Sequence, residues 1–390
     1  MFLIKKILTF CFIIFGQIVF AQTTRVITLE TRTARNPFGI EMQIPSAEPV
    51  VGLALSGGGA RGFSQIGVLK ALEEADINIG AIAGTSIGSI VGGLYASGYS
   101  IDDLDSIVRI TNWDDLLSLS GSTGRRELFI DQKIAEDRSI FTLRLDWFRP
   151  VIPTSFNEGL KLSNYLTLLS LNAPISARKN FDDLLIPYRA VCTDLINGNA
   201  VILKSGSIGQ VMRASSSVTF FLAPTQIDSL TLVDGGLISN IPVSAVKNLS
   251  PDLVIAVNTT SPLRREDDLI LPWNIADQTV SIPMKQLEEK QLKEADLIIQ
   301  PNLGTWSAAD FSKADSLINL GYNSTHPLIK GLKTSLDALF KSNLNDEEYF
   351  IKNVKFPTSI EPFEIKYQQK YAGRDSVSSH EIKADLADIF

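Results

Sequence analysis

From Ile77 to Ile101 the chain contains no charged residue, and this stretch is long enough to cross a membrane as a helix. Six glycines interrupt it, and the sequence Gly84-Thr85-Ser86-Ile87-Gly88 lies near its middle. Glycine is unfavourable inside a helix but permits tight turns. We therefore expect a short strand at 79–83, a sharp turn and a buried helix at 87–97, rather than one membrane span.

The strand–helix pattern recurs along residues 49–335, which we predict to be the main domain. An apolar strand-like run at 50–55 is followed by an amphipathic helix at 63–75. Further strands are predicted at 188–193, 200–204, 230–233, 253–257 and 297–300, and helices at 208–214 and 283–295. This alternation indicates an α/β fold with three layers, in which a mostly parallel central sheet is covered by helices on both faces. The 45% hydrophobic content supports a core of that size.

The N-terminus has the features of a targeting segment. Lys5 and Lys6 precede an apolar run that extends to Phe20, and Ala21 supplies the small residue of a cleavage site. This pattern predicts a secretory signal peptide at 1–21, because the apolar run is short for a membrane span. Residues 22–48 are predicted as a lead-in segment with one edge strand. We expect the protein to be exported to the cell envelope (periplasm or outer membrane) or secreted.

Composition excludes several functional classes. The net charge of −7 disfavours nucleic acid as a partner, since neutralising phosphates requires an excess of Lys and Arg. With two His and two Cys, the chain can form neither a Cys/His-rich zinc array nor a disulfide scaffold. Removal of the signal peptide would also remove Cys11, which leaves Cys192 without an intrachain disulfide partner.

A glycine-rich loop, Gly57-x-Gly59-x-x-Gly62, follows the first predicted strand and precedes a helix. A dinucleotide-binding fold would place an acidic residue at the end of the next strand, but that strand runs into Gly84-Thr85-Ser86. A phosphate-binding P-loop requires Lys after the last glycine, where this chain has Phe63. The backbone N–H groups of such a loop can hold a phosphate or the oxyanion of an acyl-transfer intermediate.

The sequence Gly84-Thr85-Ser86-Ile87-Gly88 favours the second use. It is a Gly-x-Ser-x-Gly sequence at a strand-to-helix junction, which is the structural context that a nucleophile elbow needs. Gly84 and Gly88 allow a tight turn that directs the serine side chain into a cleft. We therefore predict that Ser86 is a nucleophile.

A nucleophilic serine needs a base, and histidine is the usual one. The only candidates are His326, near a predicted helix start, and His380, in the tail outside the main domain. A carboxylate is therefore considered, and Asp234 is the best candidate because it closes a predicted strand and should reach the same sheet edge as Ser86. Apolar neighbours would raise its pKa toward a range useful for a general base. The alternative is a turn aspartate, since Asp-Gly is a common turn sequence.

With these motifs in this order, the chain resembles the patatin-like phospholipase family over residues 50–330. Gly57-Gly58-Gly59-Ala60-Arg61-Gly62 matches the family's oxyanion loop, Gly84–Gly88 its nucleophile elbow, and Asp234-Gly235-Gly236 its aspartate motif. Supporting segments are Ile186-Pro187-Tyr188, Thr193-Asp194-Leu195, Arg213-Ala214-Ser215, Asn240-Ile241-Pro242, Asp310-Phe311 and Gly321-Tyr322. Ser217-Val218-Thr219 departs from the pattern, because many relatives have a proline there.

The resemblance implies a lipid acyl hydrolase, often a phospholipase A, that works with a Ser–Asp dyad and no histidine. Ser86 would be the nucleophile, Asp234 the general base, and backbone N–H groups of residues 57–62 the oxyanion hole. An acyl-enzyme would form, with no metal or organic cofactor, and the substrate would be a phospholipid or a membrane surface. The alternatives are an esterase or thioesterase acting on soluble acyl substrates, or a non-catalytic passenger module of an outer-membrane barrel protein.

The tail, residues 345–390, is expected to form a small α+β segment. Strands are predicted at 349–356 and 363–367, and the capping-box pattern Ser378-Ser379-His380-Glu381 predicts the start of a helix. This β…α order is similar to the start of a POTRA module, a periplasmic unit that precedes outer-membrane β-barrels in some patatin-like proteins. The similarity implies a barrel beyond Phe390 in a Gram-negative envelope. The sequence leaves open whether the chain pairs with itself as a homodimer.

Overall fold

The computed structural model describes residues 26–27, 49–117, 144–146, 149–151, 157–177, 179–219, 221–353, 364–370 and 378–383. The chain divides into two compact units. The larger unit is Ser46–Asp346, and the smaller combines Met1–Pro45 with Glu347–Phe390. The predicted signal peptide lies outside the described residues and stays a prediction.

An eight-stranded sheet forms the centre of the larger unit, with the strand order β11-β10-β2-β3-β6-β9-β8 and with β7 paired to β6. Its strands are β2 (Val51–Leu55), β3 (Ile79–Thr85), β6 (Tyr188–Asp194), β7 (Ala200–Leu203), β8 (Thr225–Ile227), β9 (Leu230–Asp234), β10 (Leu253–Val257) and β11 (Leu297–Ile299). Neighbours from β11 to β6 are parallel, whereas β7, β8 and β9 add antiparallel pairs. The predicted mostly parallel sheet is confirmed.

The two faces of the sheet differ in side-chain size because successive strand residues point to opposite sides. Leu53 and Leu55 of β2 pack into the larger of two apolar clusters, whereas Ala54 between them belongs to the other. The helices that contribute to the larger cluster include α2 (Ser64–Glu73), α3 (Ile87–Ala96), α4 (Ile101–Ile110), α7 (Leu160–Leu171), α8 (Ile208–Ser215) and α12 (Ala314–Thr325). On the alanine-rich face lie α10 (Val243–Lys247) and the end of α11 (Pro272–Leu292). The predicted three layers are confirmed.

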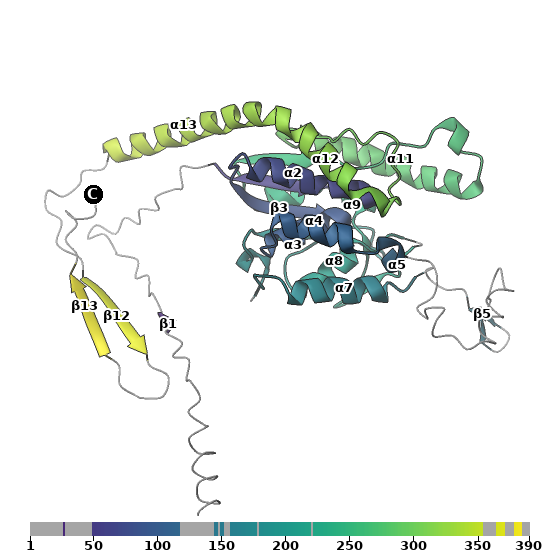
Figure 1. Ribbon diagram of the computed structural model, residues 1–390, viewed down its shortest axis with the longest axis horizontal. Coiled ribbons are helices and arrows are strands. Elements are labelled where there is room, and N and C mark those ends of the chain that lie inside the picture. Colours follow the sequence, from purple (N-terminus) through teal and green to yellow (C-terminus); the bar gives the residue numbers. More distant parts are fainter. Residues whose placement is uncertain are drawn as a thin grey trace, which may run out of the picture. The chain divides into compact units, whose positions relative to one another are not determined.

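Glycines allow α2 and α12 to cross in close contact, as Figure 1 shows. A Cβ on Gly67 of α2 would collide with the carbonyl oxygen of Ile318, and one on Gly321 would collide with that of Ser64. The motif glycine of Gly321-Tyr322 is therefore needed for helix packing. Because α2 begins directly after the glycine-rich loop, this crossing also fixes the position of the loop.

Two long helices near the C-terminal end of the larger unit differ from the predictions. Helix α11 begins at Pro272, eleven residues before the predicted start, and continues through Pro283. Helix α13 (Ile329–Asn353) includes residues 349–353, so the strand predicted at 349–356 is wrong. A growing helix adds one hydrogen bond for each residue ordered, and this cooperativity outweighs a short alternating pattern.

The remaining described elements are short. They are α5 (Trp113–Leu117), α9 (Gly236–Ser239), the 3-10 helices Gly59–Phe63, Phe181–Asp183, Glu266–Asp268, Phe311–Lys313 and His326–Leu328, and the hairpin of β4 (Arg144–Asp146) and β5 (Arg149–Val151). The uncharged stretch 77–101 forms β3, a turn and α3, as predicted. Within the described part of the chain, no helix has the length and apolar character that a membrane span requires.

The smaller unit contains a three-stranded antiparallel sheet of β1 (Val26–Ile27), β12 (Glu364–Lys370) and β13 (Ser378–Lys383). Strand β12 confirms the strand predicted near 363–367. The helix predicted from Ser378 is wrong, because these residues pair with β12 from Ser378↔Gln369 to Lys383↔Glu364. Pairing along a whole strand outweighs a capping pattern, which concerns the first turn of a helix alone.

Candidate active site

Ser86 lies in a tight turn between β3 and α3, with φ 55° and ψ −125°. This conformation is unfavourable for a residue with a side chain, and such strain is typical of functional sites. Both flanking glycines are required by close contacts. A Cβ on Gly84 would collide with the backbone of Gly88, and one on Gly88 would collide with the carbonyl oxygen of Leu55. The turn therefore has the geometry that the Gly-x-Ser-x-Gly sequence predicts.

Hydrogen bonds hold the backbone of Ser86 in this conformation. Its N–H donates to Ser215 Oγ at 3.0 Å, and the Ser215 hydroxyl donates to the carbonyl oxygen of Val191 at 2.6 Å. The Ser89 hydroxyl donates to the carbonyl oxygen of Ser86 at 2.6 Å. Ser215 belongs to the motif Arg213-Ala214-Ser215, but no pattern in the sequence indicates this role.

Asp234, at the end of β9, lies beside Ser86. The Ser86 hydroxyl donates to Asp234 Oδ2 at 2.5 Å, and the Gly236 N–H donates to Asp234 Oδ1 at 2.7 Å. Strand β9 runs antiparallel to β6, and its register sets Asp234 opposite Cys192. The neighbouring Val191 pairs with Thr85, the residue before the serine. The predicted convergence is therefore present, and strand register rather than a shared strand direction produces it.

Burial controls the acidity of this carboxyl group. Asp234 is 8% exposed, and desolvation raises its pKa from 3.8 to about 6, against the hydrogen bonds from Ser86 and Gly236 that lower it. The expected rise in pKa is confirmed. A carboxylate with a pKa near 6 is ionised at neutral pH and is a stronger base than an exposed aspartate. Burial also raises the pKa of Cys192, and the charge of Asp234 adds to this rise.

The glycine-rich loop between β2 and α2 lies against the serine turn. A Cβ on Gly57 would lie 3.3 Å from Ser86 Cβ, and one on Gly62 would collide with the Ile87 side chain. Gly58 and Gly59 have φ values of 153° and 57°, which glycine adopts without steric cost.

Not all six residues of the predicted oxyanion loop have a free N–H group. The Gly57 N–H donates to the carbonyl oxygen of Asn240 at 3.1 Å, and the Ala60 N–H donates to that of Ala308 at 2.7 Å. The N–H groups of Gly58 and Gly59 donate to no acceptor within the described parts of the chain. These two groups are therefore the best candidates for oxyanion donors.

Arg61 contributes to the loop through its side chain. Its guanidinium donates to the carbonyl oxygens of Thr259, Thr260, Gly304 and Trp306, at distances of 3.0 to 3.2 Å. The side chain is buried, and desolvation lowers the pKa of the guanidinium. Arg61 thus attaches the glycine-rich loop to the segments that follow β10 and β11.

Within the larger unit, the single described histidine does not occupy the position of a triad base. His326 begins a 3-10 helix between α12 and α13, where its ring lies 5.9 Å from that of Tyr322. His380 lies in β13 of the smaller unit. Among the described hydrogen bonds, those of the Ser86 hydroxyl and of the Asp234 carboxylate include no histidine.

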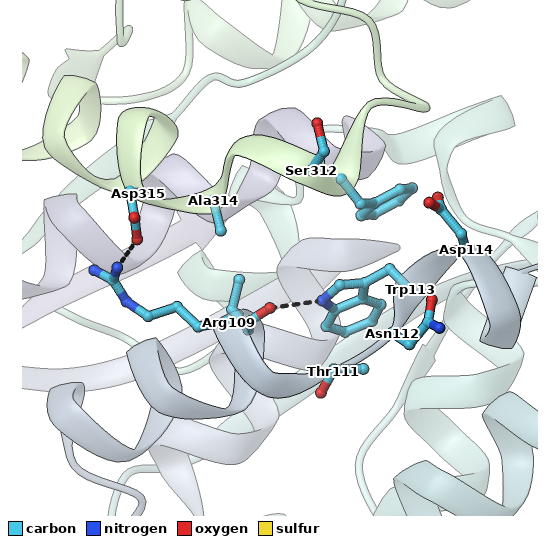
Figure 2. Close-up of a pocket in the computed structure, with 10 residues that line it drawn as sticks. Arg109, Thr111, Asn112, Trp113, Asp114, Ser312, Ala314 and Asp315 are labelled. Atoms are coloured by element: carbon cyan, nitrogen blue, oxygen red, sulfur yellow. Dashed lines mark hydrogen bonds and ion pairs between the residues drawn. The ribbon is translucent and has the colours of Figure 1, made fainter.

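A pocket of about 310 Å³ lies apart from these residues, between α4 and the start of α12 (Figure 2). Its lining includes Arg109 and Asp315, which form an ion pair, and the stacked rings of Trp113 and Phe311. No residue of the serine turn, the glycine-rich loop or the aspartate motif lines it. Within the described chain, no group of three or more His, Cys, Asp or Glu side chains could hold a metal ion.

The fold and this geometry define a class, the acyl hydrolases that carry a serine on a strand-to-helix elbow. The model of the patatin-like phospholipase family matches residues 53–247, which is half of the chain. The chain therefore belongs to the patatin-like phospholipase family.

Relatives agree with this assignment. The chain is 28% identical to lysophospholipase NTE1 of Scheffersomyces stipitis, in a match that covers 70% of this chain and 17% of that protein. It is 29% identical to patatin-like phospholipase domain-containing protein 6 of Mus musculus, in a match that covers 70% of this chain and 20% of that protein. The chain thus spans about a fifth of the length of these relatives.

Among solved structures, VipD from Legionella pneumophila is 16% identical, with a TM-score of 0.39 over 73% of this chain and 67% of that chain.

Proposed function

We propose that this protein is a serine lipid acyl hydrolase of the phospholipase A type, with Ser86 as nucleophile and Asp234 as general base. The observation that carries the proposal is the 2.5 Å hydrogen bond from the Ser86 hydroxyl to the buried Asp234 carboxylate. The relatives are named as a lysophospholipase and a phospholipase domain protein, which supports a lipid ester as the substrate.

In the first half of the reaction, Ser86 Oγ attacks the ester carbonyl carbon while its proton moves to Asp234 Oδ2. The carbonyl oxygen becomes an oxyanion, which the N–H groups of Gly58 and Gly59 stabilise. Collapse of this intermediate breaks the ester C–O bond, and Asp234 returns the proton to the departing alcohol oxygen. The acyl group is then bound covalently to Ser86.

In the second half, water attacks the acyl-enzyme. Asp234 accepts a proton from this water, and the same two N–H groups stabilise the second oxyanion. Collapse breaks the bond between the acyl carbon and Ser86 Oγ, which takes the proton back from Asp234. The products are a fatty acid and the free enzyme, and no step requires a metal or an organic cofactor.

Product analysis with phosphatidylcholine vesicles tests the proposal. The wild-type protein is expected to release fatty acid and lysophospholipid, and Ser86→Ala to reduce the rate by about 10⁴-fold or more. Ser106→Ala changes an exposed serine of α4 and serves as the matched control, with wild-type activity expected. Turnover near the wild-type rate in folded Ser86→Ala would refute the nucleophile assignment.

Two other functions predict different results. An esterase or thioesterase for soluble substrates would show no increase in rate when the lipid forms aggregates, whereas a lipase is expected to show a sharp one. A non-catalytic passenger module would not react with a fluorophosphonate probe. Labelling of the wild-type protein and not of Ser86→Ala would exclude the passenger function.

A further inference from the structure

Helix α11 carries a buried acidic residue, Glu288, that the proposed mechanism does not use. The residue is 4% exposed. Glu288 Oε1 accepts from Asn240 Nδ2 at 2.5 Å, and Oε2 lies 2.9 Å from Thr260 Oγ1 and 2.7 Å from Lys285 Nζ. Hydrogen bonds to a buried carboxylate are strong, and loss of the charge leaves buried donors without an equivalent acceptor.

Through Asn240, Glu288 is connected to the first residue of the glycine-rich loop. The carbonyl oxygen of Asn240 accepts from the Gly57 N–H at 3.1 Å. A Cβ on Gly57 would collide with Asn240 Oδ1, and one on Gly236 would lie 3.2 Å from the same atom. Asn240 therefore contacts both the glycine-rich loop and the aspartate motif, and Glu288 fixes the orientation of its amide group.

Through Thr260, Glu288 is connected to the other end of the same loop. The carbonyl oxygen of Thr260 accepts from Arg61 Nη2 at 3.2 Å, and its hydroxyl lies against the Glu288 carboxylate. Gly58 and Gly59, which carry the two free N–H groups, lie between Gly57 and Arg61. One buried charge thus connects the supports at both ends of the segment that carries these groups.

We propose that Glu288 is a positioning residue for the oxyanion loop, and this inference rests on the proposed function. Its carboxylate holds Asn240 and Thr260, which hold Gly57 and Arg61 and so orient the N–H groups of Gly58 and Gly59. These groups act on the oxyanion, which exists only in the reacting state. Loss of Glu288 is therefore expected to lower kcat more than it changes KM.

The test compares Glu288→Gln with Glu289→Gln, which changes the adjacent exposed residue of the same helix. Glutamine keeps the shape of Glu288, but its NH2 group takes the place of one carboxylate oxygen. This group donates hydrogen bonds, so it would face groups that themselves donate to the carboxylate. Glu288→Gln is expected to lower kcat by about 10–10²-fold, with KM within about twofold. Glu289→Gln is expected to match the wild type in both constants. An unchanged kcat, or a rise in KM alone, would overturn the proposal.

A double-mutant cycle tests whether the effect passes through Asn240. If it does, Asn240→Ala combined with Glu288→Gln lowers kcat by less than the product of the two single effects. Fully multiplicative effects would contradict this connection.

Hydrogen exchange tests the positioning role without relying on activity. The Gly57 N–H, which is bonded to Asn240, is expected to exchange faster in Glu288→Gln than in Glu289→Gln, at temperatures where both are folded. Unchanged exchange of Gly57 would overturn the positioning role, even if Glu288→Gln lowered the melting temperature. A wild-type protein that hydrolyses no ester would instead refute the proposed function, and the exchange result would still decide the role of Glu288.

Discussion

Two glycine-containing turns follow the neighbouring parallel strands β2 and β3, and they present different chemical groups. After β3, the turn places the unfavourable positive φ on Ser86, whose side chain is the proposed nucleophile. After β2, the loop places positive φ values on Gly58 and Gly59, whose backbone N–H groups are the proposed oxyanion donors. In one turn glycine flanks the proposed nucleophile, and in the other glycine carries the proposed donors.

The supports of the two turns differ in the same way. The serine turn combines close contacts within its own motif, such as that between Gly84 and Gly88, with a distant hydrogen bond from the Ser86 N–H to Ser215. The glycine-rich loop has no side chains at its glycine positions, so it is held by distant groups, including Asn240 and the segment after β10 that Arg61 reaches. A five-residue motif therefore contains part of what the first turn needs, whereas no short motif contains what the second one needs.

The largest effect beyond Ser86 itself is expected at its partner. Asp234→Asn removes the base and is expected to lower kcat/KM by about 10²–10⁴-fold. Stability should change in the opposite direction, because the pKa of Asp234 is about 6 in the folded protein against 3.8 for an ordinary aspartate. The ionised group therefore destabilises the fold at pH 7.5 by about 3 kcal/mol, a cost that is absent below the unfolded pKa and grows as the pH rises through 6.

Thermal unfolding of Asp234→Asn at pH 7.5 is thus expected at or above the wild-type temperature, while ester hydrolysis is nearly lost. If the melting temperature fell in proportion to activity, Asp234 would be a structural residue of the turn. That result would show that the serine turn, like the glycine-rich loop, is held in place by a side chain distant in sequence.

The second effect tests the loop. Gly59→Ala introduces a side chain at φ 57°, and its Cβ would collide with the carbonyl oxygen of Ala308. Displacement of one oxyanion donor is expected to lower kcat by about 10²–10³-fold. Gly198→Ala is the matched control, since Gly198 also has a positive φ of 69° but has open space around its Cβ position. Equal losses of kcat in the two variants would show that backbone strain alone, and not donor position, is being measured.

The pH profile separates the two turns, because the proposed base Asp234 titrates, whereas the backbone N–H groups of Gly58 and Gly59 do not. A base acts when it is ionised, so kcat/KM is expected to fall about tenfold per pH unit below pH 6. Above pH 7 the profile should be flat. Gly59→Ala should lower the whole curve without moving its midpoint. A shifted midpoint in that variant would contradict the separation.

The smallest effect is expected at His326. His326→Ala should change kcat/KM by less than about twofold, because the ring lies beside Tyr322 rather than in the site. Steady-state kinetics at pH 7.5 checks this. A loss as large as that of Asp234→Asn would indicate that histidine is the base and would contradict the Ser–Asp dyad.

The sequence predicted those strands and turns that a short stretch of neighbouring residues specifies. Alternating or continuous apolar runs located β2, β3, β6, β9 and β10, and glycine spacing located the two turns. Asp234 could be predicted because it ends a strand and precedes two glycines. Both residues were predicted at the same sheet edge because each follows or ends a strand, whereas their actual pairing depends on strand register.

Features set by distant parts of the chain could not be predicted in this way. The long helices α11 and α13 depend on continued helix growth, and β13 depends on pairing with β12. Glu288 gave no signal at all, since an acidic residue in a charged helix is ordinarily exposed. Its burial follows from how α11 packs, which no local pattern records.

Cys192 lies opposite Asp234 with its thiol fully buried and its pKa raised by burial. Such a thiol stays protonated at neutral pH and is inaccessible to alkylating reagents, whereas the nearby Ser86 is the proposed nucleophile. Iodoacetamide should therefore spare the enzyme that an organophosphate inactivates. This contrast in inhibitor sensitivity would distinguish it from cysteine hydrolases in a crude extract before any purification.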